Sequence, residues 1–362
     1  MVGKSRAAVL EAAGRISIRE FDIPRIGPGE GLLRLEMTGV CGSDPKFYHG
    51  KSAVVMPIIL GHEILGHIEE IGEEASRLYG VGKGDRVVVE ANIRCGSCPY
   101  CLSGDYQFCQ GGHGYGTRVS ADEPPHLWGG YGEFMYLTPG SVVHKISTEV
   151  PAEAAVLTTA VIANGIQWVR RLAGASIGDT VVIQGPGQQG LAATIAARES
   201  GASPIVVTGL SIDSQRLALA REFGADHVID VEREDVVGRV EEITRGRMAD
   251  IVVDVTGNPR AVAKSLDLVR PMGTILCAGL TGTDTLTSLA IDTLVHKQLR
   301  LQGARSKSSE AVVSALKLVE SRKYPLEKMV SHRFPLERAE EAVKTAGGDI
   351  PGVYATKVVI VP

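Results

Sequence analysis

Four of the six cysteines of the chain fall within fifteen residues, at the spacing C-x2-C-x2-C-x7-C. Thiolates this close together on a loop with glycine and proline can meet at one tetrahedral zinc ion. Because protein would fill all four positions, such a site is structural and offers no place to a substrate. An iron–sulfur cluster is the chemical alternative. The four residues are Cys95, Cys98, Cys101 and Cys109.

A second group of metal-binding residue types lies nearer the N-terminus. Cys41 stands in a glycine-flanked segment, and His62 follows twenty-one residues later between glycine and Glu63. Sulfur, nitrogen and oxygen ligands in one set are typical of a catalytic zinc with an open position. An ordinary core cysteine and a hydrogen-bonded turn histidine would also fit these residues. Cys277 lies in an apolar run and is predicted to be a buried core residue.

A glycine-rich turn follows the apolar run 181–184 and precedes an alanine-rich helical stretch. Its pattern is G-x-G-x-x-G, in which the glycines permit a tight turn, a close approach of the backbone to a pyrophosphate, and helix packing. In this context the pattern predicts a dinucleotide-binding loop. The residues concerned are Gly185, Gly187, Gln188, Gln189 and Gly190.

The next strand is where a carboxylate normally binds the ribose of NAD, but Gly209 occupies that place. Arg216 could pair with the 2′-phosphate of NADP, whereas Asp213 could reach the ribose and repel that phosphate. We expect NAD to be slightly preferred over NADP. Thr256 and Gly279, which follow later strands of the same series, complete the expected cofactor residues.

The elements that must position these residues fall into two series. From residue 177 onward, short β-branched runs alternate with amphipathic stretches such as 215–223, which predicts a parallel, doubly wound sheet. The first 150 or so residues instead show short strands between glycine-rich turns, a pattern typical of an antiparallel β domain. The tail ends in helical stretches and a strand at 357–361, which we expect to join the β domain. The runs of the first series are 181–184, 205–208, 227–229, 251–255, 274–278 and 299–302.

Composition excludes several classes of protein. With 44% hydrophobic and 22% charged residues, the 362-residue chain is of globular type and long enough for two domains. The net charge of −4, without a long run of one sign, disfavours nucleic acid and membrane surfaces as partners. The uncharged run 180–197 is broken by a turn, so it is not a membrane span. No signal-peptide pattern follows the N-terminus, and we expect a cytoplasmic protein.

Taken together, the two metal motifs and the glycine loop make the whole chain resemble the zinc-dependent medium-chain alcohol dehydrogenases, particularly their polyol and threonine dehydrogenase-like branches. The resemblance implies an α/β protein with a GroES-like β-rich catalytic domain, residues 1–155 and 296–362, and a Rossmann domain, residues 156–295. It also implies two zinc ions per chain and zinc-assisted hydride transfer. By this resemblance Cys41 and His62 bind the catalytic zinc, Ser43 takes the alcohol proton, and Asp44 orients His62.

The chain departs from the family pattern in two places. Many relatives carry a third zinc ligand near the position of Ala160, but no Cys, His, Asp or Glu occurs from residue 154 to 178. Glu63 is the best candidate for the missing ligand. Lys46 stands where many relatives have a proton-relaying histidine, and His49 lies three residues further on, so the proton route beyond Ser43 stays open.

We therefore expect an NAD(P)-dependent zinc enzyme that interconverts a secondary alcohol or polyol with its ketone and forms a homodimer or homotetramer. A zinc-free enone or quinone reductase with the same two domains is the alternative enzyme, and a non-catalytic zinc-stabilised binding protein is the alternative outside enzymes. Candidates for the wall of the substrate pocket are Phe47, Tyr48, Ala91 and Trp128.

Overall fold

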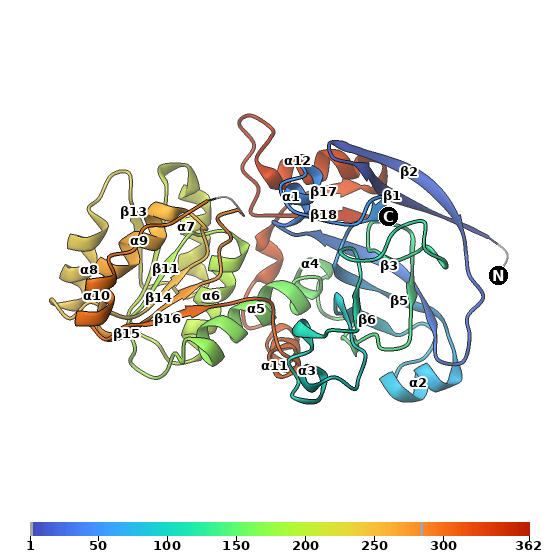
Figure 1. Ribbon diagram of the computed structural model, residues 1–362, viewed down its shortest axis with the longest axis horizontal. Coiled ribbons are helices and arrows are strands. Elements are labelled where there is room, and N and C mark those ends of the chain that lie inside the picture. Colours follow the sequence, from blue (N-terminus) through green and yellow to red (C-terminus); the bar gives the residue numbers. More distant parts are fainter. Residues whose placement is uncertain (1–2, 283–284) are drawn as a thin grey trace. The chain divides into compact units, whose positions relative to one another are not determined.

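The structure, a computed structural model, describes residues 3–282 and 285–362. The chain divides into two compact units, the first formed by the residues up to Ala160 together with Ser308–Pro362 and the second by Val161–Lys307 (Figure 1). The borders differ from the expected ones because β16 (Arg300–Gly303) pairs in parallel with β15 (Val269–Cys277). Residues 296–307 therefore belong to the second unit, and residues 156–160 to the first.

The first unit is built on two larger sheets and a two-stranded sheet of β7 (Asn92–Ile93) and β8 (His113–Gly114). A seven-stranded sheet has the order β10-β6-β5-β3-β18-β17, with β9 also paired to β3, and a three-stranded sheet has the order β2-β1-β4. Helices α1, α2, α3, α4, α11 and α12 belong to the same unit. The strands are β1 (Lys4–Ala12), β2 (Arg15–Asp22), β3 (Gly31–Val40), β4 (Ile58–Ile59), β5 (Glu63–Ile71), β6 (Arg86–Val89), β9 (Phe134–Leu137), β10 (Val143–Lys145), β17 (Val330–Pro335) and β18 (Lys357–Val361). The helices are α1 (Asp44–Tyr48), α2 (Glu73–Tyr79), α3 (Pro99–Leu102), α4 (Ala152–Ala155), α11 (Ser309–Glu320) and α12 (Ala339–Gly347).

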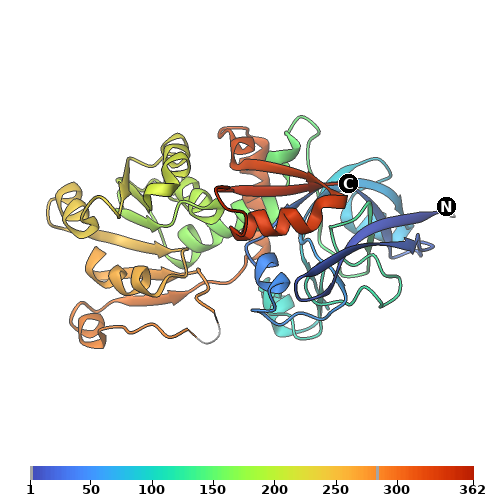
Figure 2. The ribbon, with the colours of Figure 1, turned by 90° about the horizontal axis from the view of Figure 1, so that it is seen from above.

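The C-terminal strand completes the main sheet of this unit. β18 pairs antiparallel with β3, with Val358 opposite Val40, so the prediction that the last strand joins the β domain is confirmed. On its other side β18 pairs in parallel with β17, which is the exception in an otherwise antiparallel sheet. The helix between these two strands, α12, packs on both of them, and Figure 2 shows the three elements together in red.

The second unit is a parallel sheet of six strands in the order β13-β12-β11-β14-β15-β16, with helices on both faces (Figures 1 and 2). The reversal of strand order at β11 and β14 is the doubly wound topology that the sequence predicted. The uncharged run 180–197 forms β11 and α6 with a turn between them. In the described residues, no helix is long and apolar enough to cross a membrane. Apart from β15 and β16, the α-helices and strands are α5 (Ala163–Gly165), β11 (Val181–Gln184), α6 (Gln188–Glu199), β12 (Ile205–Gly209), α7 (Ser214–Glu222), β13 (His227–Asp230), α8 (Val236–Thr244), β14 (Ala249–Asp254), α9 (Pro259–Leu268) and α10 (Ile291–His296).

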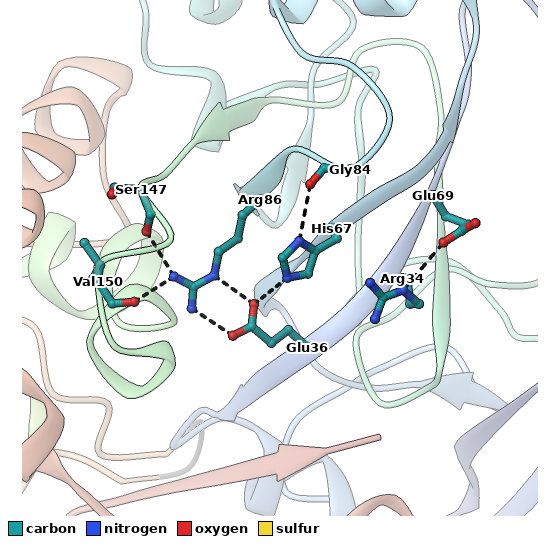
Figure 3. A network of polar contacts seen from close by, with 8 residues as sticks. All are labelled: Arg34, Glu36, His67, Glu69, Gly84, Arg86, Ser147 and Val150. Atoms are coloured by element: carbon teal, nitrogen blue, oxygen red, sulfur yellow. Dashed lines mark hydrogen bonds and ion pairs between the residues drawn. The ribbon is translucent and has the colours of Figure 1, made fainter.

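A polar network ties β3, β5 and β6 of the first unit together (Figure 3). Arg86 donates Nε and Nη2 to the two carboxylate oxygens of Glu36, both at 2.8 Å, and Nη1 to the carbonyls of Ser147 and Val150. His67 Nε2 lies 3.0 Å from the same carboxylate. Because the Arg86 side chain is only 5% exposed, the carboxylate of Glu36 is needed to stabilise its buried positive charge.

We expect Glu36→Gln to lower the free energy of unfolding by about 3 kcal/mol, since it leaves the guanidinium of Arg86 buried without an opposite charge. Urea denaturation measures the change. The matched control is Arg34→Met, because Arg34 is 53% exposed and its ion pair with Glu69 is 3.5 Å long (Figure 3). That variant should change the stability by less than about 0.5 kcal/mol. Equal effects of the two substitutions would show that the network does not stabilise the sheet.

Candidate active site

Strand pairing explains why Cys41 and His62 meet although twenty-one residues separate them. β3 ends at Val40, directly before Cys41, and β5 begins at Glu63, directly after His62. The two strands are antiparallel with Gly39 opposite Glu63, so the end of one strand lies beside the start of the other. The ligand atoms of Cys41, His62 and Glu63 all lie within 4.8 Å of one another.

Asp44, the first residue of α1, supports this group from inside the protein. Its side chain is fully buried and accepts hydrogen bonds from the Cys41 backbone N–H at 2.9 Å and from the Tyr131 hydroxyl at 2.8 Å. Its other oxygen, Oδ1, lies 3.5 Å from Nδ1 of His62. Asp44 therefore faces Nδ1 and leaves Nε2 as the nitrogen for a metal, which agrees with its expected role in orienting His62.

The charges of the group favour a cation. Burial alone lowers the pKa of His62, but the neighbouring Asp44 and Cys41 outweigh burial and raise this pKa to about 9. Burial raises the pKa of Asp44, and His62 opposes that shift in part. Oε1 of Glu63 is buried and has no hydrogen-bond partner among the described residues. Sulfur, nitrogen and oxygen donors with an unsatisfied buried oxygen fit a zinc ion, which would take the place of the imidazole proton.

The four-cysteine lobe has the geometry of a closed tetrahedral site. Sγ of Cys95 lies 3.9 Å from Sγ of Cys101, and Sγ of Cys98 lies 3.9 Å from Sγ of Cys109. Four thiolates at ~2.3 Å from a zinc ion stand about 3.8 Å apart, so the four residues fit this ion. Backbone N–H groups of Ser97 and Cys98 lower the pKa of Cys95 to about 6, which favours the thiolate that a metal binds. All six cysteines are free thiols.

The glycine loop has the backbone that a dinucleotide needs. Gly185 directly follows β11 and has a φ of 104°, a conformation that side chains with a Cβ rarely adopt. A Cβ at Gly190 would collide with the carbonyl of Gly185, so the turn closes only with glycine at both places. α6 then begins at Gln188. A helix that begins directly after such a turn has its N-terminus where the sequence predicts the pyrophosphate.

Two regions of the chain match known families. Residues 27–148 match the alcohol dehydrogenase GroES-like domain, and residues 190–321 match the zinc-binding dehydrogenase domain. The chain is 40% identical to a protein of Mycobacterium tuberculosis H37Rv described as "Probable alcohol dehydrogenase", over 99% of this chain and 98% of that protein. The chain belongs to the zinc-dependent medium-chain alcohol dehydrogenase family.

Other members of the family extend the comparison. An erythritol/L-threitol dehydrogenase of Mycolicibacterium smegmatis is 30% identical over 99% of this chain and 98% of its own length. A zinc-binding dehydrogenase of Sinorhizobium meliloti 1021, solved bound to NADP, has a TM-score of 0.87 and 25% identity, and the match covers 99% of this chain and 100% of that chain. The predicted family and the predicted pair of domains, GroES-like and Rossmann, are thus confirmed, and the protein is an enzyme.

Two residues beside the candidate metal-binding group were missed by the sequence analysis. Tyr131 donates its hydroxyl to Asp44, and burial together with that carboxylate raises the pKa of Tyr131 well above its usual value. Lys357 forms a buried ion pair with Glu63. Neither residue is close to the metal motifs in sequence. The sequence feature that could have identified Lys357 is a charged residue at the start of an otherwise apolar terminal strand.

The structure places the residues of the expected proton route, and the position of the missing zinc ligand, as follows. Ser43 is the N-cap residue of α1, beside Cys41, and Lys46 lies within the helix. His49 Nε2 lies 2.8 Å from a carboxylate oxygen of Asp349, so it is engaged elsewhere. Ala160 is buried and offers no ligand atom.

Two of the four candidate wall residues are held by contacts of their own. Tyr48 donates its hydroxyl to the carbonyl of Gly14 at 3.0 Å, and Trp128 donates Nε1 to the carbonyl of Glu123 at 2.8 Å. Both residues are buried in the core of the first unit, and their place in the pocket wall stays a prediction. Phe47 and Ala91 are only partly buried and remain candidates.

Gly209 and Asp213, the two residues at the expected ribose position, both make close contacts within the protein. A Cβ at Gly209 would stand 2.8 Å from Cγ of Pro186, so the proline in the glycine loop excludes the usual carboxylate. Asp213 is buried, accepts a hydrogen bond from the Leu210 N–H at 3.1 Å and pairs with Arg216 at 2.7 Å. Thr256 donates its hydroxyl to Asp254 at 2.6 Å, and Gly279 lies against Gly257, so both follow the strand ends as expected.

Proposed function

We propose that the enzyme oxidises a secondary alcohol or polyol, and reduces the matching ketone, at a zinc ion held by Cys41, His62 and Glu63, with NAD as its cofactor. The observation that carries the proposal is the close approach of the ligand atoms of these three residues, together with a buried oxygen of Glu63 that has no hydrogen-bond partner among the described residues. Family membership and the two relatives named as alcohol and erythritol/L-threitol dehydrogenases support the substrate class. The four-cysteine lobe would hold a second zinc, which gives two per chain.

Zinc in such a site supplies a Lewis acid that polarises the substrate oxygen. The side chains of the protein hold the ion and move the proton, and the nicotinamide accepts the hydride. Cys41 and Glu63 provide negative ligands, and Asp44 fixes the orientation of His62 through Nδ1. Ser43, partly exposed beside Cys41, takes the alcohol proton at its Oγ and passes it to solvent.

A screen of secondary alcohols, vicinal diols and polyols with NAD and NADP tests the proposal, with absorbance of the reduced cofactor as the measurement. Activity that a zinc chelator abolishes and added zinc restores supports it. Turnover of enones alone, unchanged by the chelator, would instead identify a zinc-free reductase.

The cofactor preference rests on the carboxylates around the loop after β12. Asp213 lies there, and Ser211 donates its hydroxyl to Asp230 at 2.6 Å and its N–H to Glu232 at 2.8 Å. Three carboxylates repel a 2′-phosphate, and the two arginines beside them, Arg216 and Arg233, pair with Asp213 and Asp230 rather than standing opposite a phosphate. The NADP in the Sinorhizobium meliloti relative shows only that such a fold accepts that cofactor.

We expect Asp213→Ala to lower the ratio of kcat/KM with NAD to kcat/KM with NADP by about tenfold, since it removes the negative charge beside Arg216. Steady-state kinetics with both cofactors measure this ratio. Asp267→Ala is the matched control, because Asp267 forms an exposed i,i+3 pair with Lys264 in α9 and should leave the ratio unchanged. A selective loss of activity with NADP would refute the preference for NAD.

We further propose a cytoplasmic homo-oligomer. Six free cysteines, four of them in a metal lobe, suit a reducing compartment. Among the described residues, β16 has a paired neighbour on one side only, and the apolar residues Ile291, Val295 and Leu301 near it are exposed. Such an edge favours strand pairing with a second copy, which sedimentation analysis would detect as a dimer or tetramer.

A further inference from the structure

A lysine from the last strand reaches the candidate metal site. Lys357, the first residue of β18, is among the largest fully buried side chains of the protein. Its Nζ donates to Oε2 of Glu63 in a buried ion pair and to the carbonyl of Val40 at 3.0 Å. Burying an ammonium group lowers the stability of the fold unless the group is paired. Packing alone therefore does not explain why a lysine stands at this position.

The backbone leaves space for this pair at one glycine of β3. Gly39 lies opposite Glu63 on β5 and opposite Val359 on β18. A Cβ at Gly39 would collide with Oε2 of Glu63 and stand 2.9 Å from Cε of Lys357. The missing side chain is therefore what allows the carboxylate and the ammonium to meet between the three strands.

The two oxygens of Glu63 have different surroundings. Oε2 is bound by Lys357, whereas Oε1 is buried and has no hydrogen-bond partner in the described part of the chain. A ligand oxygen of Glu63 lies within 4.8 Å of the ligand atoms of Cys41 and His62. A carboxylate held at one oxygen has less freedom to turn the other oxygen away from its neighbours.

We propose that Lys357 is the positioning residue of the catalytic zinc site: it holds Oε2 of Glu63 so that Oε1 is the single carboxylate oxygen offered to the metal. The inference rests on the proposed function, because it assumes that zinc binds to Cys41, His62 and Glu63. The charges agree with it. The negative charges of Cys41 and Glu63 balance a divalent ion, and Lys357 balances Asp44, so the buried group is neutral as a whole.

The test compares the wild type with Lys357→Met by zinc release to a chelator and by the absorption spectrum after replacement of zinc by cobalt. Lys357→Met is expected to release the catalytic zinc at least ~10-fold faster and to shift the cobalt bands, while the zinc of the four-cysteine lobe stays. Lys357→Arg, which keeps the charge, is expected to restore slow release. Lys145→Met, which breaks an exposed pair with Asp85, is the matched control and should change neither readout.

The double variant Glu63→Gln/Lys357→Met decides the case even if the single methionine variant is unstable, because it leaves no unpaired charge inside. If Lys357 acts through Glu63, the double variant should release zinc at the rate of Glu63→Gln alone. Additive effects of the two substitutions, or a methionine variant that releases zinc like the wild type, would overturn the inference. A wild type with one zinc per chain, unaffected by Cys41→Ser, would refute the proposed function instead.

Discussion

Cys41→Ser is expected to lower kcat/KM by about a thousandfold or more and to reduce the zinc content from two ions per chain to one. The polarisation of a substrate oxygen by a metal contributes several kcal/mol to the stabilisation of the transition state, and about 4 kcal/mol corresponds to a factor of a thousand. Serine keeps the size of the side chain but replaces the thiolate with a neutral hydroxyl. Elemental analysis and steady-state kinetics on the same preparation measure both effects.

Cys277→Ser is the control for this prediction. Cys277 lies at the end of β15, is partly buried, and belongs to the second unit rather than to either metal group. Burial raises its pKa to about 11, so it stays a neutral thiol near pH 7. The control should keep both zinc ions and most of the activity. If Cys41→Ser kept its activity and both ions, the catalytic zinc site would have to be placed elsewhere.

Local sequence signals predicted the parts of the structure that are made by neighbouring residues. The four cysteines lie within one short loop, and the glycine loop lies between one strand and one helix, so spacing alone places each set. The closing strand at 357–361 was predicted with the bounds that the structure has. In these cases the residues that interact are also close in the chain, and the turn chemistry that brings them together can be read directly.

The remaining parts depend on pairing between distant strands. Lys357 meets Glu63 across 294 positions of sequence, and Tyr131 meets Asp44 across 87. Both contacts follow from the strand order β5-β3-β18 and from loops whose paths a single sequence does not define. Gly209 is a similar case, because a Cβ there would stand 2.8 Å from Cγ of Pro186, a contact that the sequence alone does not reveal.

The lobe of residues 95–109 is where the second large effect is expected, because little besides a metal could hold it together. None of the residues of α3 is buried, and Tyr100, Leu102 and Phe108 are all exposed. Its buried side chains are those of Tyr106, Gln107 and Cys109, and the hydroxyl of Tyr106 donates to Glu90 at 2.7 Å. A segment with so few buried apolar side chains offsets little of the entropy lost on ordering, so we expect a metal bound by the four thiolates to supply much of the stability.

Cys98→Ser is therefore expected to destabilise the lobe by about 4 kcal/mol, the range in which loss of a metal site falls, and to leave one zinc per chain. The fraction of molecules with an open lobe would rise roughly a thousandfold, and proteases would cut within residues 96–108 at a correspondingly higher rate. Limited proteolysis followed by mass spectrometry measures the rate and the position of the cuts. The initial activity at low temperature should fall much less than in Cys41→Ser, because the proposed catalytic ligands lie at the adjoining ends of β3 and β5 and keep their own contacts. Ser103→Ala, at an exposed position of the same lobe, is the control and should be cut like the wild type. Equal cutting of Cys98→Ser and the wild type would mean that the lobe is held by contacts other than its metal.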